Sequence, residues 1–110
     1  MDEATKRLYE LKAEVIQAAA HPIRLAVLDF LRDGEQCVCD IATHVEAERS
    51  NVSRHLALMT KAGLLESRKE GLKVMYSLKC PCILDFVGCV TSVLREQLED
   101  RRAALGNLAD

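Results

Sequence analysis

Apolar residues recur at helical spacing through the first part of the chain, and a proline divides them into two segments. Apolar positions three or four apart, with charges between them, predict a first helix over about residues 3–19. His21 precedes Pro22, and a residue before proline is held out of helical geometry, so this helix ends there. Pro22 suits the first turn of a second helix, which we expect to stop near Asp33 and Gly34.

The middle of the chain predicts two shorter helices joined by a tight turn. After a brief extended piece over residues 36–38, Cys39 falls at the N-cap of a third helix, with Asp40 in its first turn. The apolar side of this helix is expected to be buried: Ile41, Ala42 and Val45. Residues 46–49 form the turn, and Ser50 caps a fourth helix over residues 51–61 that stops at Gly63. Its inward positions are Val52, Leu56 and Met59.

A strand pattern follows, and then one long helical pattern. Residues 64–68 and 72–78 are expected to pair as a two-stranded ribbon, with Gly71 taking a positive φ at the turn. Pro81 opens the last helix. One apolar stripe runs along this helix, with two more apolar residues beside it: Ile83, Val87, Val90, Leu94 and Leu98, then Phe86 and Val93.

These elements predict a mainly α, α+β fold of about five helices and a two-stranded β-wing, which is a winged helix-turn-helix. At 110 residues, the chain is expected to form a single domain over residues 1–110. The first and last helices present more apolar surface than so small a core can cover. We therefore expect a homodimer built from these two helices, with packing onto the monomer as the alternative.

The charge is unevenly distributed. The net charge is −2, yet residues 49–79 carry seven Lys/Arg against two Asp/Glu, between acidic segments. A basic middle next to a helix-turn-helix predicts DNA binding, because the leading end of the second helix enters the major groove. The candidate DNA-binding residues are Ser50, Asn51, Ser53, Arg54 and His55 on the helix, and Arg68, Lys69 and Lys73 on the wing.

The five cysteines fall into two groups, Cys37 with Cys39, and Cys80 and Cys82 with Cys89. No apolar run is long enough to cross a bilayer and the acidic N-terminus does not look like a signal peptide, so we expect a cytoplasmic protein with reduced thiols. Soft sulfur ligands suit As(III), Cd(II), Pb(II) or Cu(I). We therefore treat all five cysteines as candidate metal ligands.

Four segments of the chain form a recognisable set of motifs: residues 21–25 (HPIRL), 37–41 (CVCDI), 53–59 (SRHLALM) and 62–65 (AGLL). Together they closely resemble the arsenic-repressor (ArsR/SmtB) family of bacterial metal-sensing repressors. The resemblance covers about residues 8–79. It implies a symmetric dimer that binds an inverted-repeat operator and releases it on binding a metal or metalloid, most simply As(III) or Sb(III). His21 takes a structural role in this comparison.

The sequence also departs from the family pattern. The arsenic-type repressors that it resembles carry a third cysteine where this chain has Ala42, and no cysteine precedes Cys37 as in the cadmium and lead type. Cys82 and Cys89 are seven residues apart on one helical face, so with Cys80 they offer a second three-thiol site. No histidine follows His55, which argues against the zinc site of the zinc-sensing relatives.

Three other functions compete with metal sensing. A redox or polysulfide sensor of the same fold would oxidise its cysteine pairs instead of binding an ion. A thiol oxidoreductase is disfavoured, because such enzymes place Cys-x-x-Cys beside a βαβ unit that this sequence lacks, so we expect no enzyme. A winged helix that binds only proteins would show weak, salt-insensitive association with DNA.

Overall fold

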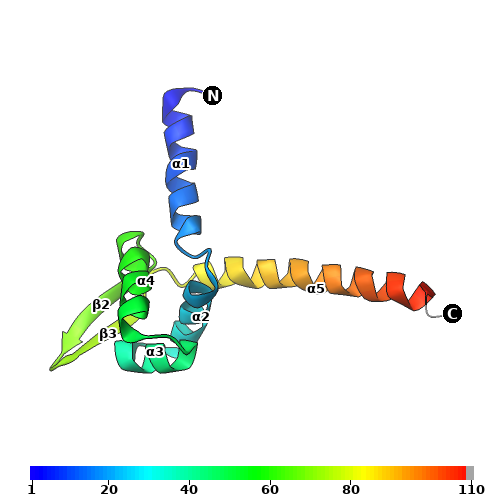
Figure 1. Cartoon of the computed structure of the whole chain (residues 1–110). Coiled ribbons are helices and arrows are strands. Elements are labelled where there is room, and N and C mark those ends of the chain that lie inside the picture. Colours follow the sequence, from blue (N-terminus) through cyan, green and yellow to red (C-terminus); the bar gives the residue numbers. More distant parts are fainter. Residues whose placement is uncertain (109–110) are drawn as a thin grey trace.

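The computed structural model describes residues 1–108 and contains five α-helices and three strands in that range (Figure 1). In chain order the elements are α1 (Glu3–Gln17), α2 (Pro22–Phe30), the 3₁₀ turn η1 (Leu31–Asp33), β1 (Gln36–Cys37), α3 (Val38–Val45), α4 (Arg49–Lys61), β2 (Leu65–Glu70), β3 (Lys73–Leu78) and α5 (Ile83–Leu108). Helices α3 and α4 form the predicted helix-turn-helix, and β2 with β3 forms the wing. Figure 1 shows the wing extending beyond the helices on the same side of the molecule as α4.

The wing belongs to a three-stranded antiparallel sheet with the order β1-β3-β2. Strand β3 lies in the middle, where Met75 is opposite Cys37 of β1 on one side and opposite Arg68 of β2 on the other. Gly71 closes the β2–β3 turn with φ +62°, as predicted. The sequence indicated that residues 36–38 are extended, but not that two of them pair with the wing.

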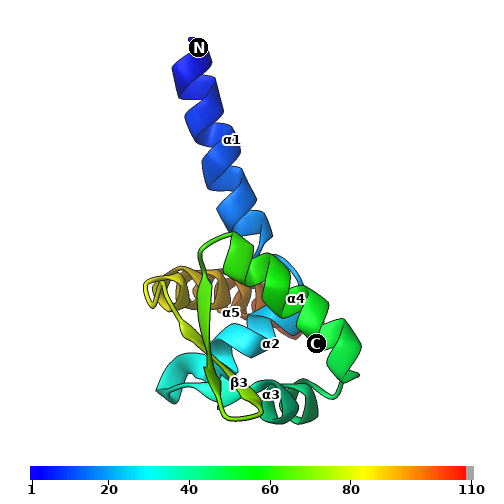
Figure 2. The same cartoon turned by 90° about the vertical axis from the view of Figure 1, so that its left-hand side faces the viewer.

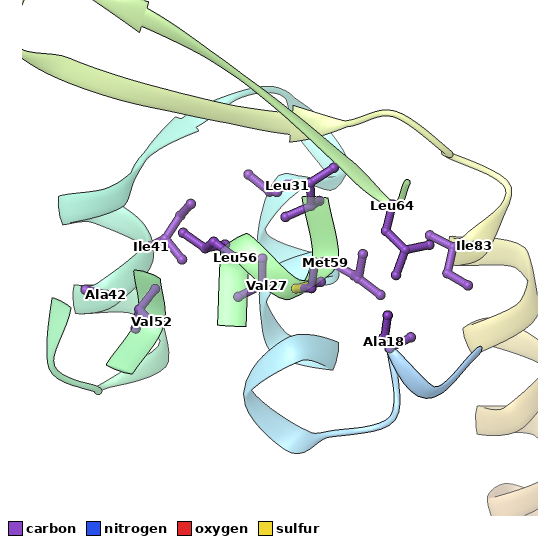
Figure 3. Packing of buried hydrophobic residues seen from close by; sticks show 13 residues of the cluster. Ala18, Val27, Leu31, Ile41, Ala42, Val52, Leu56, Met59, Leu64 and Ile83 are labelled. Atoms are coloured by element: carbon purple, nitrogen blue, oxygen red, sulfur yellow. The ribbon is translucent and has the colours of Figure 1, made fainter. Parts of the chain in front are cut away.

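The core lies where α2, α3, α4 and the base of the wing meet (Figure 3). The predicted inward face of α4 is confirmed, since Val52, Leu56 and Met59 are fully buried. Ile41 and Ala42 of α3 are buried as predicted, whereas Val45 is only partly buried. This packing presents the opposite face of α4 to solvent, because a helix that buries one side must expose the other.

The N-cap of α3 is Cys37 and not Cys39, so the predicted start of that helix is wrong by two residues. Cys37 is extended, with φ −79° and ψ 159°, and its Sγ accepts a hydrogen bond from the Asp40 amide at 3.4 Å. Pairing with β3 ends at Cys37, and the helix starts at the next residue. This boundary depends on a strand pairing between distant residues, which local capping rules do not include.

The predicted cap of α4 is also wrong. The helix starts at Arg49, with Glu48 at its N-cap and no side-chain capping bond, so Ser50 lies inside the first turn. The connection is shorter than expected because Glu46 takes a left-handed conformation, with φ 55° and ψ 47°, at the end of α3. That conformation reverses the chain direction at once, so residues 46–48 are enough to connect α3 to α4.

Several other boundaries differ from the prediction. Helix α1 ends at Gln17, and the buried Ala18 and Ala19 form the corner that leads into α2. Helix α2 ends at Phe30, and η1 carries the chain on to Asp33. Helix α5 starts at Ile83 and not at Pro81. Residues 80–82 form a turn before it, and their carbonyls accept hydrogen bonds from the amides of residues 83–85. Of the wing strands, predicted at 64–68 and 72–78, β2 starts one residue later and ends two residues later, whereas β3 starts one residue later and ends at Leu78 as predicted.

Replacing Gly63 with Ala should lower the free energy of unfolding by about 1 kcal/mol. Gly63 follows α4 with φ +91°, and a Cβ there would meet nothing within 4 Å, so the cost comes from the backbone alone. Chemical denaturation monitored by circular dichroism measures it. Gly106→Ala is the matched control, because Gly106 is helical, is equally open and should gain slightly from alanine. Equal stability of the two variants would contradict the prediction.

Helices α1 and α5 project away from the core in different directions (Figures 1 and 2). No residue of α1 is buried, and Ile83 is the one buried residue in the described length of α5. The radius of gyration is 17.9 Å, whereas a compact domain of this length has about 13 Å. A single copy of the chain therefore leaves the apolar faces of both helices uncovered.

Candidate nucleic-acid interface and cysteine sites

The outward face of α4 is polar and basic. Helical spacing places Ser50, Arg54 and Lys61 opposite the buried side, and all three are exposed, as is Ser53 on one flank. No acidic residue occurs within α4. Lys61 was not among the predicted DNA contacts, although its seven-residue spacing from Arg54 places the two side chains on one face of α4. Arg49, exposed at the first residue of α4, was not predicted either.

His55 lies on the flank of α4 that faces α2. Its ring centroid is 4.5 Å from that of His21, whose Nδ1 accepts a hydrogen bond from the Ile23 amide at 3.0 Å and caps α2. Partial burial, together with electrostatic interactions with His21, Arg24 and Arg54, lowers the pKa of His55. This shift favours the neutral form of the His55 ring. Asn51, one turn earlier, is half-buried on the same flank.

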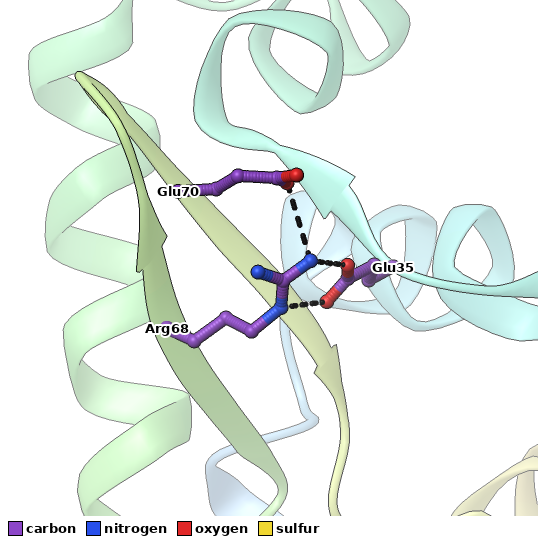
Figure 4. A network of polar contacts seen from close by, with 3 residues as sticks. All are labelled: Glu35, Arg68 and Glu70. Atoms are coloured by element: carbon purple, nitrogen blue, oxygen red, sulfur yellow. Dashed lines mark hydrogen bonds and ion pairs between the residues drawn. The ribbon is translucent and has the colours of Figure 1, made fainter.

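The three predicted wing residues lie in different surroundings. Lys69 and Lys73 are exposed beside the β2–β3 turn. Arg68 contacts both carboxylate oxygens of Glu35, with its Nε 3.0 Å from Oε2, and also lies 3.2 Å from Glu70 (Figure 4). The hydrogen bond from Arg68 lowers the pKa of Glu35, and Glu35 raises the pKa of Arg68. Arg68 is thus already paired within the protein, unlike the two lysines.

The first cysteine pair borders both parts of the DNA-binding unit. Cys37 is buried and Cys39 is exposed. Both line a small hollow whose other walls come from α4 and the wing: Arg49, Leu72, Lys73 and Val74. Cys39 also borders a second hollow, formed with the turn between α3 and α4. Two basic side chains therefore line the same hollow as the two thiols.

The second cysteine group is only partly assembled. The Sγ atoms of Cys80 and Cys82 are 3.2 Å apart in the turn before α5, and both are free thiols. The hydrogen bond and charge of Cys80 raise the pKa of Cys82. Cys89 is exposed further along α5, where seven residues of helix correspond to about 10.5 Å along the axis. Cys89 therefore does not lie next to the other two thiols, which are in the turn before α5.

Within residues 1–108, no three His, Cys, Asp or Glu side chains are grouped so that they could hold a metal ion. The predicted three-thiol site at Cys80, Cys82 and Cys89 is therefore not assembled within one copy of the chain. Cys80 and Cys82 instead offer two adjacent thiols, and Cys37 and Cys39 line one hollow. An ion that prefers three sulfur ligands would take its third from another source.

Comparisons with known proteins show which family the chain belongs to. Residues 21–67 match the family described as bacterial regulatory protein, arsR family. An uncharacterized HTH-type transcriptional regulator of Mycobacterium tuberculosis is 34% identical over 102 residues, which cover 92% of this chain and 90% of the relative. The chain belongs to the ArsR family. The resemblance predicted from the sequence is thus confirmed.

Two further ArsR-related proteins add detail. The homodimeric winged helix-turn-helix DNA-binding domain of a possible ArsR-family regulator from Mycobacterium bovis superposes with a TM-score of 0.77 at 30% identity, covering 91% of this chain and 93% of that one. The arsenical resistance operon repressor of Escherichia coli is 39% identical over 69 residues, which are 62% of this chain and 59% of that repressor. The predicted winged helix-turn-helix is therefore confirmed.

Membership of the ArsR family makes this chain a DNA-binding transcriptional regulator and not an enzyme, as predicted. In a helix-turn-helix the second helix enters the major groove, which makes the outer face of α4 the candidate DNA-facing surface. Among the helices described for this chain, none combines the length and apolar character that crossing a membrane requires.

Proposed function

We propose that this ArsR-family protein is a homodimeric repressor that binds an inverted-repeat operator and releases it when its cysteine thiolates capture a soft metal(loid), As(III) first among them. The observation that carries the proposal is the position of Cys37 and Cys39, which share one hollow with Arg49 of α4 and Lys73 of the wing. A ligand held there lies against both parts of the DNA-binding surface.

The basic outer face of α4 supports the operator half of the proposal. The side chains that can reach base edges are Ser50, Ser53 and Arg54, and Arg suits guanine. Lys69 and Lys73 are free to contact the flanking phosphates, which would set the register of the protein on the duplex. His55 and Asn51, half-buried on one flank of α4, are better placed for the edge of the contact than for its centre.

The exposed apolar stripes support the dimer. Val90 and Leu94 of α5 are 46% and 60% exposed, and Ile16 of α1 is 46% exposed. These residues border one largely apolar groove between α5 and the α1–α2 corner. Because a continuous apolar groove of this kind favours association, a second copy of α1 and α5 is its most natural occupant.

The two-thiol site at Cys37 and Cys39 provides a way to disturb the DNA-binding unit. Cys37 Sγ accepts the bond that caps α3, so a metalloid bound to that sulfur competes with the Asp40 amide. Losing a cap costs a helix about 1 kcal/mol. Arsenite, As(OH)₃, can exchange two hydroxyls for the two sulfurs with loss of two waters, which leaves its third position to hydroxide or to a thiol from outside the site.

Replacing Cys37 with Ser should leave operator binding unchanged and reduce release by arsenite at least tenfold. Fluorescence anisotropy with a duplex from the promoter of the protein's own gene, titrated with sodium arsenite under reducing conditions, measures both quantities. Cys89→Ser is the matched control, because Cys89 is an exposed thiol on α5 and does not line the hollow that holds Cys37 and Cys39. A Cys37→Ser protein that still releases the duplex at wild-type arsenite concentrations would rule out this site as the sensor.

Thiol oxidation is the second candidate function, and the 3.2 Å separation of the Cys80 and Cys82 sulfurs favours it. Peroxide would convert the two thiols to one disulfide, with two electrons and two protons passing to the peroxide to give two waters. Titrating the same complex with hydrogen peroxide, in wild type and in Cys82→Ser, separates the two functions. Release by peroxide that is lost in Cys82→Ser, without release by arsenite, would favour the redox sensor.

A further inference from the structure

The first cysteine pair is joined to the wing through the sheet. Residues 36 and 37 form β1, which pairs with β3 of the wing, and Cys37 is opposite Met75. Arg68 of β2 is opposite the same Met75 from the other side. Cys37, Met75 and Arg68 thus form one row across three strands, and neighbouring strands are about 4.8 Å apart. A displacement of Cys37 therefore also displaces β3, which is one of the two strands of the wing.

An ion pair also joins β2 to the residue that precedes β1. Glu35 immediately precedes β1, and Arg68 is on β2, two strands that are not neighbours because β3 lies between them. The Arg68 guanidinium meets Glu35 in a two-bond geometry, through Nε at 3.0 Å and through a second contact from its Nη2 (Figure 4). Paired contacts of this kind restrict orientation more than a single bond does. The pair therefore holds β2 to the segment that leads into Cys37.

We propose that the Glu35–Arg68 ion pair is a strap that holds the wing in its DNA-binding position and transmits the state of the Cys37–Cys39 site to it. This inference rests on the proposed function, which supplies the inducer that binds at Cys37 and Cys39. It assigns Glu35 and Arg68 as positioning residues and leaves the phosphate contacts to Lys69 and Lys73. Glu35 lies two residues before Cys37, so a ligand that moves Cys37 also moves the carboxylate that Arg68 holds.

The exposure of the pair is consistent with a strap more than with a stabilising core contact. The Arg68 side chain is 52% exposed and that of Glu35 is 33% exposed, so solvent and salt weaken the attraction. Removing the pair should therefore leave the fold intact and change where the wing points. Variants at these positions can accordingly be tested as folded proteins.

The experiment compares Glu35→Gln, Arg68→Gln and the double variant with wild type, by anisotropy on the promoter duplex with and without sodium arsenite. We expect each single variant to bind the duplex about threefold more weakly than wild type, and the double variant to bind no more weakly than either single variant. In all three variants, the ratio of the affinity without arsenite to that with arsenite should fall about fivefold. Arg68→Lys, which keeps the charge, should recover part of this ratio.

Glu70→Gln is the matched control. Glu70 also lies 3.2 Å from Arg68, but it is on the same strand and so bridges nothing. This variant should keep both the wild-type affinity and the wild-type ratio. All variants should melt within a few degrees of wild type, which shows that a lost ratio does not come from unfolding.

Two results would overturn the strap. If Arg68 contacts DNA directly, Arg68→Gln weakens binding whereas Glu35→Gln frees Arg68 and strengthens it. If the effects of the two substitutions simply add, the two residues do not act through one another. If arsenite fails to release the wild-type protein from the duplex, arsenite is not the inducer and the ion pair does not transmit its binding. The affinities of the single and double variants without arsenite still decide whether the pair positions the wing.

Discussion

Replacing Arg54 with Glu should reduce operator affinity about 100-fold or more. Arg54 is at the centre of the exposed face of α4, next to Ser50 and Ser53, and no acidic residue of α4 lies near it. A well-placed Arg contact with a base contributes about 1–3 kcal/mol of discrimination, and a dimer loses it twice. The substitution also sets a carboxylate against the phosphates. Anisotropy with the promoter duplex and with an unrelated duplex measures the loss of specific and of non-specific binding.

Arg102→Glu is the matched control for this prediction. It changes the net charge by the same amount, but Arg102 is exposed near the far end of α5, which projects away from α4 and the wing (Figure 1). Its effect should stay within about threefold, because charges further apart than the Debye length of about 8 Å are largely screened. Equal losses in the two variants would show that overall charge, and not the α4 face, controls binding.

Replacing Val90 with Glu should convert the dimer to a monomer and lower operator affinity about 100-fold. Val90 borders the apolar groove formed with Leu94 and Ile16, so a carboxylate there would be buried without a partner in the dimer. A monomer binds one half-site at a time and loses the gain that comes from linking two sites. Size-exclusion chromatography with light scattering gives the mass, and anisotropy gives the affinity.

Ser92→Glu serves as the control for the dimer. Ser92 is on the face of α5 opposite the apolar stripe and is exposed, so the same charge should leave the mass and the affinity unchanged. A Val90→Glu protein that remains dimeric would contradict the assignment of α5 to the interface. A protein that becomes monomeric yet binds normally would contradict the two-half-site operator.

The sequence by itself determined the winged helix-turn-helix, the buried side of α4 and the glycine at the wing turn. These features depend on local periodicity and local backbone preference, which each segment carries on its own. The inward residues Val52, Leu56 and Met59 and the positive φ of Gly71 agree with that prediction. The family resemblance came from short motifs between residues 21 and 65, and the family match covers nearly the same region, residues 21–67.

The tertiary structure decided the features that join distant parts of the chain. Pairing of β1 with β3 placed the cap of α3 at Cys37 and not at the predicted Cys39. Arg68, a predicted DNA contact, pairs with Glu35, which lies 33 residues earlier in the sequence. The start of α5 at Ile83 left Cys80 and Cys82 in the preceding turn, and the rise of the helix separated Cys89 from them. In each case the deciding contact or distance is set in three dimensions, and side-chain spacing along the sequence does not contain it.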